Sequence, residues 1–124
     1  SILCEIITDR EFYDYEAKYS NEHGAFIEIP AKISKNLSSK AQEIAIKTYR
    51  ILNCEGMARV DLFLQKKNHQ FVICEINTIP GFTSHSMYPK LWEATGIPLP
   101  KLLDRLIDLA IERFEKEKKL KTSV

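Results

Sequence analysis

The amino-acid sequence predicts an α+β fold in which an antiparallel sheet is flanked by helices. Two hydrophobic patterns predict it: short segments in which apolar and polar residues alternate, and longer ones in which apolar residues recur every three or four positions. Their order along the chain favours antiparallel strands covered by helices. The 124 residues, 44% of them hydrophobic and 28% charged, fit one folded domain.

Four segments are predicted to be strands. Residues 2–7 form an apolar, β-branched run, and residues 25–29 form a shorter one. Apolar and polar side chains alternate over residues 58–64, and a second strand is expected over residues 71–77. Because only the polar turn at residues 66–69 separates the last two strands, they are expected to form an antiparallel hairpin.

Three segments are predicted to be helices. Apolar residues at helical spacing predict an amphipathic helix over about residues 38–53, with Ser34 or Ser38 as its N-cap. A second helix is expected over residues 86–95. A continuous apolar stripe predicts a last helix that opens near Pro98.

Charge and composition exclude several classes of protein. There are 18 Lys and Arg against 17 Asp and Glu, so a basic surface for non-specific nucleic-acid binding is not expected. No apolar run approaches the roughly 18 residues of a membrane span, and residues 1–10 lack the pattern of a secretory signal. Cys4, Cys54 and Cys74 have no metal-site spacing, which favours buried, reduced thiols in a cytoplasmic protein.

The predicted hairpin carries a set of polar residues at one end. Arg59 and Asp61 share one face of their strand because side chains alternate. Glu75 and Asn77 likewise share a face of the second strand. The opposite face is expected to hold the apolar residues Val72, Cys74 and Ile76. The turn leaves open whether Asp61 lies directly opposite Glu75 or one residue away.

These residue types suit two interpretations. Carboxylate and amide oxygens are ligands for a hard cation such as Mg²⁺, and an arginine suits the charge on a phosphate or a tetrahedral oxyanion. Alternatively, the residues form a solvated outer face in which Arg59 pairs with Asp61 or Glu75. The spacing alone does not decide between them.

Two loops adjoin these strands. Residues 9–23 are rich in aromatic and charged residues without a regular period, which is typical of a lid or binding loop, and we expect this segment to be mobile. Residues 77–86 lead into a predicted helix, and Gly81 lets backbone amides approach an anion there. A tight turn in which Ser86 serves only as the N-cap is the alternative.

Three stretches of the chain closely resemble the D-alanine–D-alanine ligases, an ATP-grasp family of bacterial cell-wall synthesis. They are residues 11–19 (EFYDYEAKY), 58–61 (ARVD) and 75–89 (EINTIPGFTSHSMYP). The resemblance implies that residues 1–124 are the C-terminal ATP-grasp subdomain, with N-terminal and central domains ahead of it in the full-length enzyme. It also implies that ATP phosphorylates a first D-alanine and that the amine of a second attacks the acyl phosphate. The products are then ADP, phosphate and D-alanyl-D-alanine for peptidoglycan.

The resemblance further implies roles for single residues in catalysis. Two Mg²⁺ ions, or Mn²⁺ in their place, are expected on Asp61, Glu75 and Asn77. Arg59 and the backbone amide of Gly81 are expected to stabilise the anionic centre of the reaction. Tyr19 is expected to anchor the lid over the site.

Substrate contacts follow from the resemblance in the same way. The carboxylate of the second D-alanine is expected to contact Lys18, Ser86 and the amide of Met87. The ATP site is expected to include Phe12, Cys74 and Glu75.

The resemblance also bounds what the chain is expected to do. The family's phosphate-binding loop and ATP-gripping lysines belong to the other domains, so we expect these 124 residues alone to be inactive and to bind ATP or Mg²⁺ weakly. The full-length enzyme is expected to be a homodimer. Three alternatives are a relative that adds D-lactate or D-serine, a stand-alone binding or assembly module, and a metal-dependent phosphohydrolase.

Overall fold

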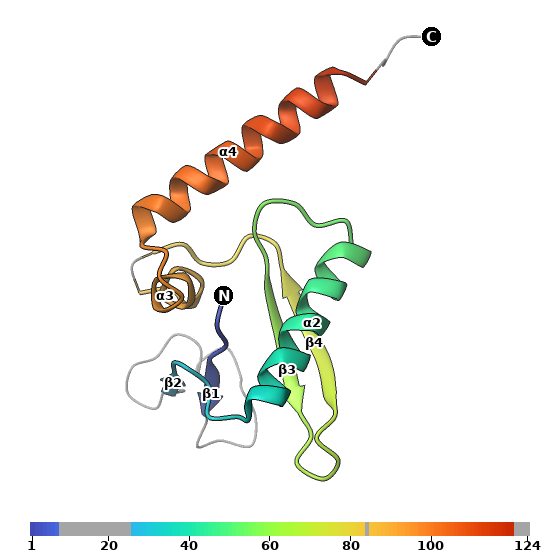
Figure 1. The fold of residues 1–124 in the computed structure, drawn as a ribbon, viewed down its shortest axis with the longest axis vertical. Coiled ribbons are helices and arrows are strands. Elements are labelled where there is room, and N and C mark those ends of the chain that lie inside the picture. Colours follow the sequence, from blue (N-terminus) through green and yellow to red (C-terminus); the bar gives the residue numbers. More distant parts are fainter. Residues whose placement is uncertain (8–25, 84, 121–124) are drawn as a thin grey trace.

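A computed structural model describes residues 1–7, 26–83 and 85–120, and their arrangement is the predicted α+β fold (Figure 1). The elements in chain order are β1 (Glu5–Ile7), β2 (Phe26–Glu28), α2 (Lys35–Ile51), β3 (Arg59–Leu64), β4 (Phe71–Asn77), α3 (Met87–Ala94) and α4 (Leu99–Lys118). The whole predicted lid, residues 9–23, lies outside the described residues, and with it lie the predicted site residues Phe12, Lys18 and Tyr19. The expectation that this segment is mobile therefore falls outside the described residues as well.

The described strands form two antiparallel pairs. Strand β1 pairs with β2, where Glu5 lies opposite Glu28. Strand β3 pairs with β4 over their whole lengths and forms the predicted hairpin. The expected antiparallel sheet is therefore divided into two two-stranded sheets in the described part of the chain.

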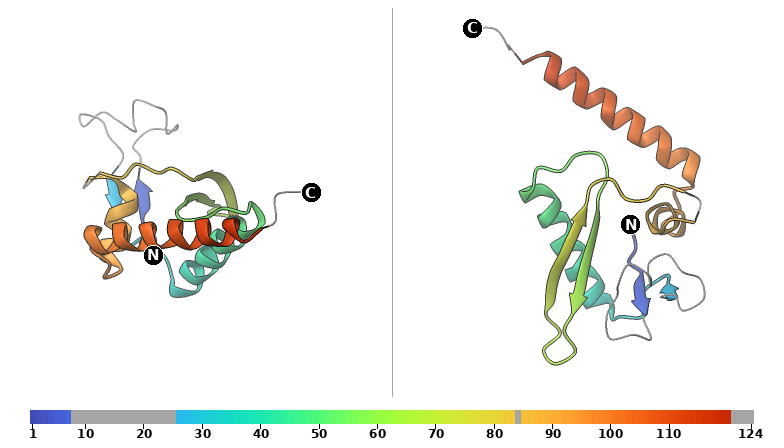
Figure 2. Two further views of the ribbon diagram at one scale, coloured as in Figure 1. Left: turned by 90° about the horizontal axis from the view of Figure 1, so that it is seen from above. Right: turned by 180° about the vertical axis from the view of Figure 1, so that it is seen from behind.

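Helix α2 covers one face of the β3–β4 hairpin, as the two opposite views in Figures 1 and 2 show. Its buried residues Ala41 and Thr48 are seven positions apart and so lie on the same side of the helix. On β3, Val60 and Leu62 alternate with the polar residues, whereas Phe63 is 62% exposed. The polar residues of β3 therefore lie on the face of the hairpin that α2 does not cover.

A β-bulge interrupts the β3–β4 pairing. Asp61 pairs with Glu75, but the next residue, Leu62, pairs with Ile73. Cys74 is therefore the extra residue on β4, with no partner in the register.

In the part of β4 that precedes Cys74, the bulge reverses which side chains point to each face of the hairpin. Val72 pairs with Phe63 and so shares the face of Glu75, whereas it was expected to share the face of Ile76. That part of the prediction is wrong because the extra residue shifts the alternation by one position. The expectation of a buried Cys74 is also wrong, because the bulged residue is exposed. All three cysteines are free, as predicted.

Helix α2 begins one turn earlier than predicted. Ser34 is its N-cap, and the Ser34 hydroxyl accepts a hydrogen bond from the backbone N–H of Leu37 at 3.3 Å. Of the two predicted caps, Ser34 is therefore the one used. Leu37 is the only apolar residue in the first turn of α2, residues 35–38, so the apolar period alone placed the start too late.

Replacing Ser34 with alanine is expected to lower the free energy of unfolding by about 1 kcal/mol, because the Leu37 N–H loses its acceptor. Ser38→Ala is the matched control, since it lies inside α2 and alanine has the higher helix propensity. Urea unfolding followed by circular dichroism measures both. A larger loss for the Ser38 variant would contradict the assigned cap.

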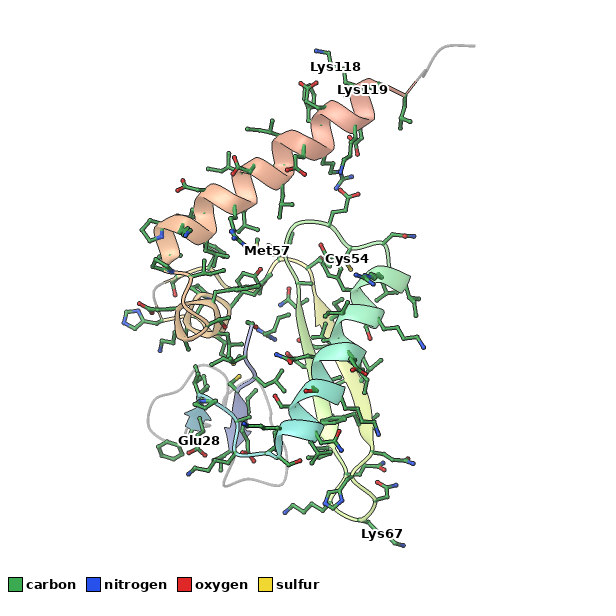
Figure 3. All side chains as sticks on the ribbon, in the orientation of Figure 1. Glu28, Cys54, Met57, Lys67, Lys118 and Lys119 are labelled. Atoms are coloured by element: carbon green, nitrogen blue, oxygen red, sulfur yellow. The ribbon has the colours of Figure 1, made fainter. Side chains whose placement is uncertain are left out.

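Helices α3 and α4 pack against each other, and α4 runs past the segment that joins α2 to β3, where Arg113 pairs with Glu55 at 2.9 Å (Figure 1). Among the described residues, the buried hydrophobic side chains are Ala41, Tyr88 and Leu102. Figure 3 shows Lys118 and Lys119 at the far end of α4, and Cys54 and Met57 in the segment that joins α2 to β3. None of the helices in the described ranges is long and apolar enough to cross a membrane.

Candidate active site

The hairpin brings four predicted site residues together at one end. Asp61 lies directly opposite Glu75, which settles the register that the sequence left open. One pair further along, Arg59 lies opposite Asn77. Partners in an antiparallel pair project from the same face, so the four side chains form one polar cluster.

Arg59 is the centre of this cluster. Its guanidinium donates from Nε to Asp61 Oδ1 and from Nη2 to Asp61 Oδ2, both at 2.8 Å. Nη2 also donates to Glu75 Oε1 at 3.1 Å, so one arginine bridges the two carboxylates. The Arg59 side chain is only 17% exposed, and that of Asp61 is 25% exposed. The ion pairs of the solvated-face interpretation are thus present, and Arg59 and Asp61 are largely shielded from water, whereas the Glu75 side chain is 44% exposed.

Asn77 links the cluster to the following loop. Its side-chain Oδ1 accepts a hydrogen bond from the backbone N–H of Ile79 at 3.0 Å, which orients the amide at the end of β4. An amide oxygen has two acceptor positions, so one remains for a further ligand.

The cluster offers only oxygen atoms to a cation. Asp61 and Glu75 contribute carboxylates, and Asn77 contributes an amide oxygen. In the described ranges, no group of three or more His, Cys, Asp or Glu side chains is placed to hold a metal ion, so a cation here would need the Asn77 amide. Two carboxylates and an amide fit a hard ion such as Mg²⁺, which keeps several waters and phosphate oxygens in its shell. Such an ion would compete with the Arg59 guanidinium for the carboxylates.

The loop after β4 positions the hydroxyl of Ser86. Ser86 is the N-cap residue of α3, yet its side chain makes no capping hydrogen bond. Its Oγ instead accepts from the backbone N–H of Thr83 at 3.0 Å. A Cβ atom at Gly81 would lie 3.0 Å from the same Oγ, so the glycine leaves room for this hydroxyl. The alternative in which Ser86 acts only as an N-cap is therefore wrong for its side chain.

Met87 is the first residue of α3. The backbone N–H groups of a helix's first turn have no partner within the helix, and they favour anions. The amide predicted for the substrate carboxylate is thus at the helix start, next to the Ser86 hydroxyl.

Two residues near the site were not predicted. Thr83 contacts Ser86 through its backbone N–H and its hydroxyl. The sequence signal that could have predicted this contact is a threonine three residues before an N-cap serine. Cys4 precedes β1, and its thiol interacts electrostatically with Asp61 and Arg59. Burial raises the pKa of the Cys4 thiol, the Asp61 charge raises it further, and the Arg59 charge partly opposes both.

The thiols of Cys4 and Cys74 are expected to react at different rates with iodoacetamide. The thiolate is the reactive form, so a raised pKa leaves less of it at a given pH, and burial slows the reagent as well. At about pH 7.5 the exposed Cys74 should be alkylated roughly tenfold faster or more, and the Cys4 rate should keep rising at higher pH. Peptide mass spectrometry over a pH series measures both rates in one sample. Equal rates at neutral pH would contradict this placement of Cys4.

Comparison with known proteins identifies the family. Residues 1–108 match the family model described as the D-ala D-ala ligase C-terminus. The chain belongs to this family. Its sequence is 55% identical over 119 residues to the D-alanine–D-alanine ligase of Baumannia cicadellinicola, covering 96% of this chain and 32% of the relative. It is 49% identical over 124 residues to D-alanine–D-alanine ligase A of Salmonella typhimurium, covering 100% of this chain and 34% of the relative. The chain thus spans about a third of the length of these curated relatives.

Solved structures of the family have the same fold. The D-alanine-D-alanine ligase of Coxiella burnetii matches with a TM-score of 0.73 at 47% identity, covering 77% of this chain and 27% of that one. The VanG D-Ala:D-Ser ligase of Enterococcus faecalis matches with a TM-score of 0.75 at 39% identity, covering 87% and 31%. The Bacillus anthracis ligase complexed with ATP matches with a TM-score of 0.73 at 32% identity, covering 92% and 36%. The predicted family and fold class are therefore confirmed.

Proposed function

We propose that this chain supplies the C-terminal ATP-grasp part of a ligase that joins two D-alanines at the expense of ATP. ATP would phosphorylate the first D-alanine, and the amine of the second would displace phosphate to give the dipeptide used in peptidoglycan. The observation that carries the proposal is the cluster of Arg59, Asp61, Glu75 and Asn77 on paired hairpin positions, in a chain of the D-alanine–D-alanine ligase family.

In this proposal the cluster stabilises the negative charge of the phosphate groups and of the reaction intermediates. Asp61, Glu75 and Asn77 would hold two Mg²⁺ ions, or Mn²⁺. When bound, such ions neutralise phosphate oxygens and align them for transfer. Arg59 would stabilise the negative charge that develops on the acyl phosphate and on the tetrahedral centre, because its guanidinium stays charged and is held in place by two hydrogen bonds to Asp61.

The loop and α3 would hold the second D-alanine. The Ser86 hydroxyl and the Met87 amide would bind its carboxylate together with Lys18, and the Gly81 amide would face the oxyanion. Tyr19 would anchor the lid. We also propose that Phe12, Cys74 and Glu75 line the ATP site, and the exposure of Cys74 at the bulge supports its part in this.

The activity of the whole enzyme would depend on the other two-thirds of the length present in its relatives. We propose that residues 1–124 follow an N-terminal and a central domain in a homodimeric, cytoplasmic enzyme. The 124 residues alone would then lack ligase activity.

A chimaera tests this function. Residues 1–124 replace the matching C-terminal third of the Coxiella burnetii ligase, and ADP release is measured with and without D-alanine. We expect release that depends on D-alanine and Mg²⁺ in the chimaera, and none from the 124-residue chain alone. A folded but inactive chimaera would contradict the proposal. Mg²⁺-dependent ATP hydrolysis without D-alanine would favour the phosphohydrolase instead.

The match to the D-Ala:D-Ser ligase VanG makes selectivity for the second substrate worth testing in the same chimaera. We expect D-alanine to be incorporated in preference to D-serine and D-lactate when each competes with it at equal concentration. Mass spectrometry of the products measures the ratio. A mainly D-serine product would place the chain with the D-serine-adding relatives.

A further inference from the structure

We propose that Thr83 is a positioning residue. It orients the Ser86 hydroxyl so that this group donates a hydrogen bond to the carboxylate of the second amino acid. The inference rests on the function proposed above. It adds a residue on the loop between β4 and α3 and gives it a defined hydrogen-bonding task.

Three hydrogen bonds join Thr83 and Ser86. The backbone N–H of Thr83 donates to Ser86 Oγ at 3.0 Å, and the two hydroxyl oxygens are 2.9 Å apart. The backbone N–H of Ser86 donates to the Thr83 carbonyl at 3.0 Å and closes a turn. The turn thus holds the Ser86 side chain as well as the backbone at the start of α3.

The direction of these bonds decides where the Ser86 proton points. A serine hydroxyl has one proton to donate and two lone pairs with which to accept. The Thr83 N–H occupies one lone pair, and the Thr83 hydroxyl fills the second when it acts as donor. The single Ser86 proton is then left for an acceptor outside the turn. A carboxylate is the acceptor that gains most from it, because charge-assisted hydrogen bonds are about twice as strong as neutral ones.

The surroundings of Ser86 support this assignment. The hydroxyl caps no backbone N–H of α3, so the helix does not explain its orientation. A Cβ added at Gly81 would lie 3.0 Å from Ser86 Oγ, so the glycine leaves room for this oxygen at the position where it meets Thr83. Thr83 itself is exposed, so packing alone does not hold its side chain. Among the described residues, its hydrogen bonds to Ser86 are contacts that order the pair.

The test compares Thr83→Val and Thr83→Ser in the active chimaera. Valine keeps the shape and the backbone N–H but removes the hydroxyl, so we expect the KM for the second D-alanine to rise about tenfold. The kcat and the KM for ATP should change less than about threefold, since Thr83 touches neither the cluster nor the acyl phosphate in this scheme. Serine restores the hydroxyl and should restore the KM.

A double variant separates positioning from a merely structural role. In the Ser86→Ala background, Thr83→Val should raise the KM for the second D-alanine no further, because the hydroxyl that Thr83 orients is gone. Additive effects, an unchanged KM in Thr83→Val, or failure of Thr83→Ser to restore it would overturn the assignment while leaving the ligase function intact. An inactive wild-type chimaera would instead overturn the proposed function, and this inference with it.

Discussion

The Arg59→Met variant of the chimeric ligase is expected to lose roughly 10²- to 10³-fold in kcat. Methionine keeps much of the side-chain length but removes the charge that is proposed to meet the acyl phosphate and the tetrahedral centre. It also removes the only bridge that the structure describes between Asp61 and Glu75, which face each other across the hairpin. D-alanine-dependent ADP release measures the effect.

Two further variants make the Arg59 result specific. Arg59→Lys keeps the charge but cannot make the bidentate hydrogen bonds to Asp61, so its kcat should be intermediate. Arg105→Met, on the exposed surface of α4, should leave kcat unchanged. If Arg59→Met retained full activity, the arginine would belong to a structural ion pair and not to the reaction.

The Arg59→Met variant also gives an independent test of the cation site. Without the guanidinium, two carboxylates lie opposite each other with no cation between them from the described part of the chain, and their repulsion lowers stability. Added Mg²⁺ should therefore raise the melting temperature of Arg59→Met by more than it raises that of the parent chimaera. Equal shifts in the two proteins would argue against Mg²⁺ binding to these carboxylates.

The sequence predicted the composition of the cluster because the rule involved is local. Alternation along a strand puts Arg59 with Asp61, and Glu75 with Asn77, whatever the rest of the chain does. The direct opposition of Asp61 and Glu75 depends on how the hairpin turn closes, which the residue types at 66–69 leave open.

The bulge at Cys74 lay beyond sequence reasoning for a different reason. A bulge inserts one residue without a mark in composition, and residues 71–74 read Phe-Val-Ile-Cys, all apolar. With no polar residue among them, the sequence gives no sign of where the alternation reverses. The exposure of Cys74 and the position of Val72 beside the polar face therefore emerged only from the register.

The contact between Thr83 and Ser86 was missed because both residues have ordinary explanations. Ser86 precedes a helix, where a serine normally caps the first turn. The side chain turns back to Thr83 instead, and Gly81 leaves room for it. Ser86 Oγ could accept either from a backbone N–H of α3 or from that of Thr83. Which one it meets depends on the backbone path of the loop, which starts at the hydrogen bond between Asn77 and Ile79 and is not encoded in any single residue.

The second large effect is expected at Glu75. In the chimeric ligase, Glu75→Gln should require at least about tenfold more Mg²⁺ for half-maximal activity and lose roughly 10²-fold in kcat at saturating Mg²⁺. Glutamine keeps the shape and an oxygen that can still accept from Arg59, so only the negative charge is removed. Glu112→Gln, an exposed carboxylate on α4, is the matched control and should change neither quantity.

The Mg²⁺ titration of Glu75→Gln separates the two interpretations of the hairpin face. If the carboxylates serve only to pair with Arg59, neutralising Glu75 weakens one 3.1 Å ion pair on a residue that is 44% exposed, and such pairs are worth about 1 kcal/mol or less. Stability would then fall slightly and the Mg²⁺ requirement would not move. If the carboxylate is also a ligand, the same small loss of stability is accompanied by a rise in the Mg²⁺ requirement, because the lost charge acts on the metal. The Mg²⁺ requirement thus separates the two cases.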